Sequence, residues 1–403
     1  MAEIISSFDR RSMNGYYKNT LAPSNFLRRI YFPKTVKLPT PKLERDFKKS
    51  KRIAAPFVSP KVGGKLYTDR GFDLQKYSIP TVGTAIKLSA EDEAFTRGLG
   101  QNPYALKQAY QKVADYLDDQ NNQIARKEQL MIAELLTTGK FQIQEVDAEG
   151  ANLGEAYEVN FGMTNIHKTG AGKFADSKPW TDPTSDPIED LKKLRKEIWQ
   201  KTGLNPRVVT LSPDVATIFI DHPKVKEVLN TRRVELGNIK PETLEPGVVY
   251  LGYINALGQD FYEYQDYIYD EKTQAEKEVL KEGSVIMGTT QNEMLYGAIA
   301  LYSRDKEGQI SENALPDIFT QERVADSWRE GNKTRVLETL SKPLPFPTDI
   351  DSFAYLDVTG VAVGGYSLKK EQIEDAEVVE EATTENEATE EAAGDNKKVR
   401  KGK

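Results

Sequence analysis

One stretch of this chain, from Asn102 to Gly139, constrains the fold more than any other. It opens with Asn102-Pro103, an N-cap residue followed by proline at the first helical position, where a missing N–H costs nothing. It closes with Thr138-Gly139, a typical left-handed helix stop. No glycine or proline lies between, and strong helix formers dominate. The sequence therefore predicts a helix of roughly 50 Å, about three times the typical globular length.

The faces of this predicted helix differ along its length. Apolar residues recur at helical spacing towards both ends: Leu106, Ala109, Tyr110, Val113, Tyr116, Leu117, Ile124, Leu130, Met131 and Leu135. The centre, residues 118–123, is almost wholly polar. Coiled coils keep an apolar seam throughout, so the pattern predicts packed ends and a more exposed middle.

Composition bounds the class of protein. The 403 residues suffice for two or three domains of about 150 residues each. The chain has no cysteine, which excludes disulfides, thiolate metal sites and cysteine nucleophiles. No run of 18 apolar residues occurs, and the N-terminus lacks an apolar core, so we expect neither a membrane span nor a secretory signal.

Charge is distributed unevenly around a net value of −7. Residues 1–52 hold 13 basic and 4 acidic side chains, whereas residues 371–403 hold 5 basic and 11 acidic ones. This division predicts a basic arm, an acidic body and an acidic tail. Four prolines between residues 23 and 41 predict an arm without regular elements. Such an arm suits nucleic acid or an acidic neighbouring subunit.

Two hairpins are predicted on either side of the long helix. Residues 65–69 and 81–88 are strand-like and flank a polar middle, as in a long two-stranded excursion. Because an isolated hairpin is marginally stable in water, we expect this one to lie on another subunit. Residues 141–146 and 155–160 alternate around a turn and predict a second hairpin.

Residues 186–302 predict a second compact unit. A helix starts at Asp186-Pro187 and ends at Gly203; its expected buried residues are Leu191, Leu194, Ile198 and Trp199. A short strand is expected at 207–211, followed by a helix that Ser212-Pro213 caps and by another helix at 223–230. Further strands are expected at 248–254, 261–269, 284–288 and 296–302. This order predicts an α+β fold, with helices on a mostly antiparallel sheet.

The last part of the chain changes character twice. Residues 334–341 and 352–358 alternate as strands, and we place them beside the hairpin at 141–160. Residues 371–395 contain no lysine, arginine or aromatic residue, which is a disordered composition.

Signals for catalysis or cofactor binding are weak. His167 is expected in a solvent-facing loop and His222 at a helix cap, which leaves no histidine cluster for a metal. The segment 169–174 lacks the spacing and the Ser or Thr of a phosphate loop. We therefore expect no enzyme, and no catalytic, cofactor or metal residues.

Two other readings stay open at this point. Paired-carboxylate hydrolysis is not excluded by counting acidic residues, although a helix dipole accounts for the negative charge at the start of the helix at 186. The acidic residues considered for such hydrolysis, in and before the first turn of that helix, are Asp182, Asp186, Glu189 and Asp190. An aromatic set could form a sugar or base platform, or simply core plus surface: Phe261, Tyr262, Tyr264, Tyr267 and Tyr269.

The order of these features resembles the lambda-type major capsid proteins of tailed phages (the capsid protein E family), which have the Hong Kong 97-like fold. The resemblance covers roughly residues 20–360. It is carried by Ala54-Ala55-Pro56-Phe57-Val58-Ser59-Pro60 with Gly63-Gly64, Pro103 to Gly139-Lys140-Phe141, Trp180-Thr181-Asp182-Pro183 with Asp186-Pro187-Ile188, Leu229-Asn230-Thr231-Arg232-Arg233, Gly288-Thr289-Thr290-Gln291, and residues 353–358.

The resemblance implies an architecture. It consists of a basic N-arm at 1–52, an extended E-loop at 53–96, a P-domain at 97–185 and 316–362 with the long spine helix, and an A-domain at 186–315. A disordered acidic tail at 363–403 is extra to the family pattern.

The resemblance also implies a function. The chain would assemble as pentamers and hexamers into the icosahedral shell of a bacteriophage, made in the host bacterial cytoplasm, with packaged dsDNA contacted non-specifically. Decoration or cement, scaffold and portal proteins are the possible partners. An encapsulin-like cellular compartment, which shares this fold, is the alternative. The expected subunit-contact residues are Arg28, Arg29, Lys65, Tyr67, Arg70, Lys76, Arg232 and Arg233.

Overall fold

The computed structural model divides the chain into two compact units, Met1–Gly360 and Val361–Lys403. All the described residues belong to the first unit: 10–19, 25–47, 73–89, 103–147, 150–168, 177–230, 242–245, 247–270, 274–302, 310, 315–331 and 333–359. The predicted acidic tail and the segment at 169–174 therefore lie outside the described residues.

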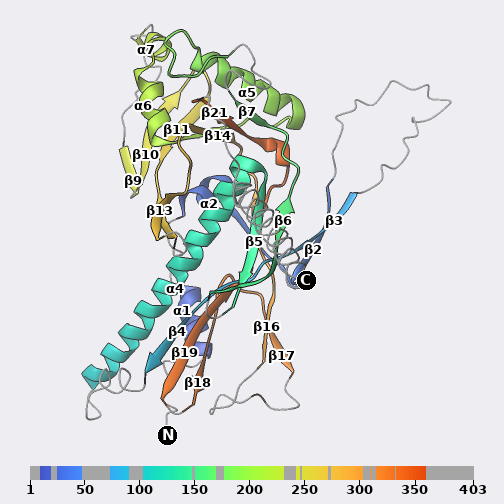
Figure 1. Ribbon diagram of the computed structural model, residues 1–403, viewed down its shortest axis with the longest axis vertical. Coiled ribbons are helices and arrows are strands. Elements are labelled where there is room, and N and C mark those ends of the chain that lie inside the picture. Colours follow the sequence, from blue (N-terminus) through green and yellow to red (C-terminus); the bar gives the residue numbers. More distant parts are fainter. Residues whose placement is uncertain are drawn as a thin grey trace, which may run out of the picture. The chain divides into compact units, whose positions relative to one another are not determined.

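The described residues form an α+β fold, as predicted (Figure 1). The helices are α1 Arg10–Asn19, α2 Phe26–Tyr31, α4 Pro103–Thr138, α5 Pro187–Thr202, α6 Pro213–Asp221, α7 Pro223–Asn230 and the 3-10 helix η1 Ile350–Ser352. The strands are β1 Lys34–Lys37, β2 Lys42–Phe47, β3 Asp73–Ser78, β4 Val82–Ser89, β5 Lys140–Val146, β6 Asn152–Asn160, β7 Ile166–Lys168, β8 Val208–Leu211, β9 Glu242–Glu245, β10 Val248–Ile254, β11 Gln259–Tyr264, β12 Tyr267–Asp270, β13 Ala275–Glu278, β14 Ser284–Gly288, β15 Glu293–Tyr296, β16 Ile299–Tyr302, β17 Pro316–Phe319, β18 Val324–Glu330, β19 Thr334–Ser341, β20 Pro343–Phe346 and β21 Phe353–Asp357.

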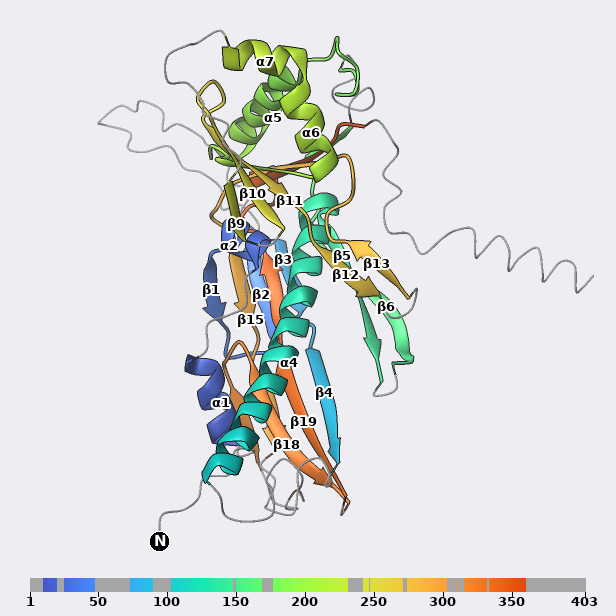
Figure 2. The same cartoon turned by 90° about the vertical axis from the view of Figure 1, so that its left-hand side faces the viewer.

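The long helix α4 is confirmed from its first predicted residue to its last. It has 36 residues and ends where Gly139 takes a φ of +75° and donates its N–H to the Leu135 carbonyl at 2.8 Å. This is the left-handed cap that only glycine adopts without strain. Figure 2 shows α4 running beside the strands of the first unit for its whole length.

The prediction that the middle of α4 is exposed is wrong for one side of the helix. Gln120 and Asn121 are buried, although Asp119 beside them is exposed. The Gln120 amide donates to the Leu337 carbonyl at 2.9 Å and accepts the Thr339 hydroxyl at 2.7 Å. Strand β19 therefore covers the polar centre, and hydrogen bonds compensate for the loss of water.

A three-stranded antiparallel sheet in the order β18-β19-β4 packs against α1 and the first half of α4. Its core contains Met13, Leu88, Val113, Leu117, Ala325 and Leu337. Residues 81–88 were predicted to pair with 65–69, but β4 pairs with β19 over its whole length. The reason is burial, because this pairing carries Leu88 into the core. Residues 65–69 lie outside the described residues.

The arm is more regular than its prolines suggested. It contains α1, α2, β1 and β2, and its prolines Pro33, Pro39 and Pro41 fall between these elements. Strand β1 pairs in parallel with β15, which also pairs with β20, and β2 pairs with β3. Proline thus marks boundaries here, because it ends elements without preventing new ones.

The second predicted unit is built on a seven-stranded sheet in the order β7-β21-β14-β8-β11-β10-β9. Its pairings are mostly antiparallel, as predicted; β7 with β21 and β8 with β11 are the parallel ones. Helices α5, α6 and α7 cover it in Figures 1 and 2. Leu191, Leu194 and Ile198 of α5 enter its core. Trp199 is 59% exposed, contrary to prediction, because it lies about 100° around the helix from Ile198.

The strands near the end of the described chain are correctly predicted as strands but wrongly placed. Strand β19 belongs to the sheet with β4, and β21 lies between β14 and β7 in the seven-stranded sheet. Neither pairs with the hairpin β5–β6, which is confirmed as a separate two-stranded element. The predicted strand at 261–269 divides into β11 and β12, and the one at 296–302 is confirmed as the shorter β16, whereas β15 before it was not predicted. The domain boundaries themselves stay a prediction.

Candidate functional site

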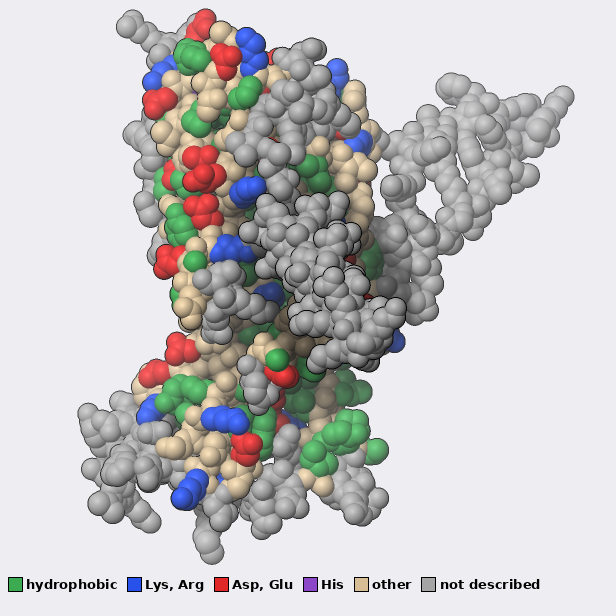
Figure 3. All heavy atoms as spheres, viewed as in Figure 1, with side chains coloured by type: hydrophobic (Ala, Val, Ile, Leu, Met, Phe, Trp, Pro, Cys, Tyr) green, Lys and Arg blue, Asp and Glu red, His purple; other side chains and the backbone are tan. Residues whose placement is uncertain are grey.

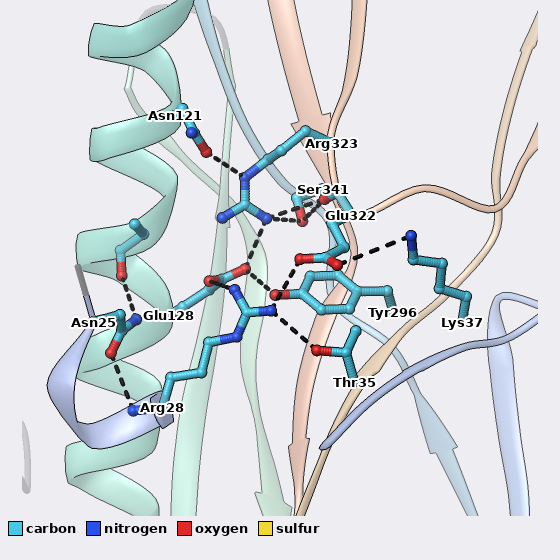
Figure 4. A network of polar contacts seen from close by, with 11 residues as sticks. Asn25, Arg28, Thr35, Lys37, Asn121, Glu128, Tyr296, Glu322, Arg323 and Ser341 are labelled. Carbon is cyan, nitrogen blue, oxygen red and sulfur yellow. Dashed lines mark hydrogen bonds and ion pairs between the residues drawn. The ribbon is translucent and has the colours of Figure 1, made fainter. Parts of the chain in front are cut away.

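A set of charged side chains lies inside the protein beside the second half of α4 (Figure 4). Its centre is Glu128, whose side chain has no exposed surface. One carboxylate oxygen, Oε1, accepts hydrogen bonds from Arg323 Nη1 at 2.8 Å and from the Tyr296 hydroxyl at 2.9 Å. The other, Oε2, lies 3.7 Å from Arg28 Nη1. A buried carboxylate is stable only with such partners.

Two nitrogens of the Arg323 guanidinium donate hydrogen bonds to neighbouring groups. Its Nε donates to Asn121 Oδ1 at 3.0 Å, and its Nη1 also donates to the Ser341 hydroxyl at 3.0 Å. Burial alone would lower the pKa of Arg323, but the Glu128 carboxylate outweighs burial and raises it above its ordinary value. The guanidinium therefore stays charged. It joins Asn121 and Glu128 of α4 to Ser341 of β19.

Arg28 brings the arm into the same network. Its Nη2 donates to Glu322 Oε2 at 2.9 Å and to the Thr35 hydroxyl at 3.2 Å, and its guanidinium lies 5.4 Å from the centre of the Tyr296 ring. Burial would lower its pKa, but Tyr296, Glu128 and Glu322 together raise it. We call the set Arg28, Glu128, Tyr296, Glu322 and Arg323 the spine clamp.

A second contact ties α2 to the helix without charge. Asn25 caps α2 by accepting the Arg28 N–H at 3.2 Å, and its own amide donates to the Ala125 carbonyl of α4 at 3.3 Å. Below it, the Tyr31 hydroxyl lies 2.8 Å from the Thr210 hydroxyl of β8. The segment from Asn25 to Tyr31 is therefore part of the core of its own subunit.

Sequence reasoning did not find this site. Asn121 and Glu128 do fall at helical spacing between Leu117, Ile124 and Leu135, so a polar residue inside an apolar stripe was the available signal. Nothing in the sequence marked the partners Tyr296, Glu322 and Arg323, which lie about 170 to 200 residues further along the chain.

The predicted subunit-contact residues are only partly described. Arg28 lies in the spine clamp, and Arg29 beside it is exposed. Lys76 lies in β3, where its backbone is opposite Glu44 of β2. The remaining residues of that set lie outside the described residues: Lys65, Tyr67, Arg70, Arg232 and Arg233. Their contacts with other subunits stay predictions.

The residues considered for chemistry have structural partners. His222 is the C-cap of α6, as predicted, and its Nε2 lies 3.1 Å from the Ser185 hydroxyl. Asp186 caps α5, and Asp190 accepts the Trp180 indole N–H at 3.1 Å. His167 lies in β7 rather than in a loop. Within the described residues no group of three or more potential ligands could hold a metal ion.

The aromatic set at 261–269 is core plus surface, the second of the two readings. Phe261 and Tyr264 are buried, whereas Tyr267 and Tyr269 are exposed. Phe26 of the arm stacks on Tyr264, with 5.4 Å between ring centres. These rings therefore fix the arm to β11 instead of forming an open platform.

None of the described helices is long and apolar enough to cross a membrane.

In the described residues, the side chains of the spine clamp hold separate parts of the fold together. A long helix is fixed at its centre by buried ion pairs, and the unit carries two-stranded hairpins with exposed apolar side chains. Exposed apolar side chains on strands are typical of a structural subunit that packs against other proteins. The sequence model of the family described as phage major capsid protein E matches residues 9–358, and the chain belongs to this family.

Relatives support the same assignment. The chain is 24% identical to the major capsid protein of Enterobacteria phage P21 over 363 residues, which cover 87% of this chain and 99% of that protein. The P21 prophage-derived major head protein of Escherichia coli O6:H1 matches equally well. The crystal structure of a putative capsid protein of an E. coli prophage has a TM-score of 0.58 at 18% identity and covers 87% of this chain and 99% of its own. The fold is thus the Hong Kong 97-like capsid fold, and the protein is a phage major capsid protein and a component of the virion.

Proposed function

We propose that this subunit assembles as pentamers and hexamers into the closed icosahedral head shell of a tailed phage, around dsDNA, in the cytoplasm of a bacterial host. The observation that carries the proposal is the family match, which spans residues 9–358. The P21 capsid protein is matched over nearly its whole length, so the proposal concerns the whole subunit and not a borrowed domain.

The geometry suits this function. A closed shell multiplies one subunit contact many times, so each contact can be weak while the whole is stable. Many weak contacts stabilise a shell together only if every subunit keeps the same shape. The spine clamp supplies a rigid centre, because two guanidiniums and two carboxylates fix α2, α4 and the residues before β18 at one point. Its role is structural, and we propose no catalysis.

The proposed partners follow from the same assignment. DNA would be contacted non-specifically, since contacts to phosphates carry no sequence information, and only weakly, since the net charge of −7 opposes binding to phosphates. Decoration or cement, scaffold and portal proteins complete the proposed set. The alternative, an encapsulin-like compartment, would enclose proteins instead of DNA; the match to a family of phage capsid proteins favours the phage shell.

Expression of the chain followed by electron cryo-microscopy tests the proposal. We expect closed shells with five-fold and six-fold rings, and particles from a producing strain that contain nuclease-protected DNA and a single portal vertex. Shells that carry enzyme cargo without DNA would favour the compartment. Clean monomers in light scattering at high concentration would contradict both kinds of shell.

A further inference from the structure

Strands β16 and β17 form a two-stranded ribbon whose register sorts its side chains onto two faces. The antiparallel pairing places Ala300 opposite Ile318 and Tyr302 opposite Pro316. Side chains alternate along a strand, and directly opposed residues share a face. Ala300, Tyr302, Pro316 and Ile318 therefore lie together on one face, which we call the outer ribbon face.

The outer ribbon face is apolar and exposed. All four of its residues are exposed, Ile318 by 67% and Tyr302 by 49%, and Leu315, which directly precedes β17, is exposed by 84%. Figure 3 shows hydrophobic side chains gathered at the lower right, where Figure 1 places this ribbon. Exposed apolar patches of this kind mark interaction sites.

The opposite face of the ribbon is anchored to the subunit. Ile299 is buried, and the Arg10 guanidinium of α1 lies 5.6 Å from the centre of the Phe319 ring. Arg10 also donates to the Tyr302 carbonyl at 3.0 Å and to Asp326 Oδ2 at 2.7 Å. The ribbon is thus held in place, so its outer face is presented in a fixed position.

The absence of charge distinguishes this face from the exposed tyrosines of β12 and from Leu153 of β6. On the hairpin β12–β13, Tyr267 is opposite Glu278 and Tyr269 is opposite Glu276. On β5–β6, Leu153 is opposite Glu145. Those sites combine an apolar residue with a carboxylate, whereas the outer ribbon face has four uncharged members.

We propose that the outer ribbon face packs against the same face of another copy of this chain, about a symmetry axis of the shell. This inference rests on the proposed function. A charge-free apolar face is complementary to itself, because placing it opposite its own copy brings no like charges together, and rotational symmetry places identical residues around an axis. The four described side chains of this face offer no charged group to a partner that is recognised by charge. Since a two-stranded ribbon alone is marginal in water, such a contact would also stabilise the ribbon.

The absence of cysteine from the chain makes the inference directly testable. In an Ile318→Cys variant every thiol in the shell is at the same position, so any covalent link joins two identical ribbons. We expect a short bismaleimide to trap linked subunits in assembled shells and not in dissociated subunits. The matched control is Tyr269→Cys, which is 59% exposed on the mixed face of β12. Linking of the Ile318→Cys shells no greater than in the control would overturn the inference, because the ribbon would then face another segment or another protein.

A charge substitution gives an independent measurement. Ile318→Lys would place an ammonium between the two faces, so we expect the subunit concentration needed for assembly to rise by about tenfold or more. Tyr269→Lys should leave it unchanged, and both variants should unfold at the wild-type urea concentration. A wild-type chain that forms no shells overturns the proposed function and this inference with it. Normal wild-type shells whose Ile318→Lys counterpart assembles at the same concentration overturn the inference alone.

Discussion

Arg323 donates to the Glu128 carboxylate over 2.8 Å, and both side chains are almost entirely excluded from solvent. The two residues lie 195 positions apart in the chain, Glu128 in the second half of α4 and Arg323 directly before β18. Breaking a buried pair costs more than the pair contributes, because the remaining charge keeps its desolvation penalty. This relationship makes the spine clamp the most sensitive polar site of the described residues.

Glu128→Gln should therefore destabilise the unassembled subunit by about 3–5 kcal/mol, since it leaves two guanidiniums with one carboxylate. Urea unfolding followed by far-UV circular dichroism measures this change. The matched control is Glu330→Gln, which breaks the 3.2 Å pair with Lys87, where both side chains are more than half exposed. That change should cost less than about 1 kcal/mol. Equal losses in the two variants would show that burial does not set the strength of the clamp.

Neighbouring arginines should separate folding from assembly. Arg28→Ala removes the link between α2 and the clamp and should cost about 1–3 kcal/mol of stability, because Glu322 and Glu128 lose a charged partner. Arg29→Ala changes an exposed residue and should alter the free energy of unfolding by less than about 0.5 kcal/mol. If Arg29 contacts another subunit as predicted, its variant should instead raise the concentration needed for assembly. Normal assembly of Arg29→Ala would remove it from the set of contact residues.

The same substitution should have opposite signs at two glycines. At Gly288 of β14, an added Cβ would lie 2.8 Å from the Tyr31 ring and 3.1 Å from the Phe353 Cβ, so Gly288→Ala should cost about 1–3 kcal/mol. Gly15 in α1 has nothing within 4 Å of an added Cβ, and Gly15→Ala should gain up to about 1 kcal/mol from helix propensity. Thermal unfolding of the two variants measures both. A gain at Gly288 would mean that the arm does not pack tightly on β14.

Acid stability should depend on Asp186. Burial would raise the pKa of this carboxyl, but the Glu189 N–H and the Lys224 ammonium outweigh burial and lower it. A lowered folded-state pKa stabilises the fold above the unfolded-state pKa of about 3.9, and this contribution is lost as the pH falls through the folded-state value.

The variant Asp186→Asn should flatten the loss of stability below about pH 4 while it keeps the cap of α5, because asparagine also caps helices. Asp186→Ala should flatten it equally and should also cost about 1 kcal/mol at neutral pH. Urea titrations at a series of pH values compare the two. An unchanged slope in Asp186→Asn would assign the acid sensitivity to other carboxylates.

The segment between β2 and β3 can be removed without opening the described fold. Phe47 and Asp73 are directly paired, so residues 48–72 leave the ribbon and return to it at the same place. Replacing them with an Asn-Gly turn should preserve the stability of the subunit and abolish closed shells, since the family resemblance assigns an inter-subunit loop to residues 53–96. Light scattering and electron microscopy of the variant provide the measurement. Shells of normal diameter would contradict that assignment.

The local features of the sequence predicted the elements well. Asn102-Pro103 and Gly139 fixed the bounds of α4, and Asp186-Pro187 and Gly203 fixed those of α5, because caps are set by residues that are neighbours in the chain. The alternating strands β4, β19 and β21 were also found. Their partners were not, because an alternating pattern states which face is apolar without stating which other strand will cover it.

The spine clamp lay beyond this kind of reasoning for the same reason. Whether a polar residue such as Gln120 is solvated or buried depends on what is packed beside it, and here the covering strand β19 comes from more than 200 residues away. The prolines of the arm misled in a different way. Proline limits where an element can run, but α2 and β1 fit between the prolines at positions 23, 33, 39 and 41, while α1 ends before the first of them and β2 begins after the last.

The place of β21 in the seven-stranded sheet has a consequence for synthesis of the protein. Strand β21 ends at Asp357 and is the last strand of the sheet to be translated. It nevertheless lies inside the sheet, between β14 and β7. Until a ribosome has translated residues 353–357, residues 166–168 have no strand to pair with, and the seven-stranded sheet stays unfinished. A chain that lacks β21 is therefore not yet the subunit that a shell requires.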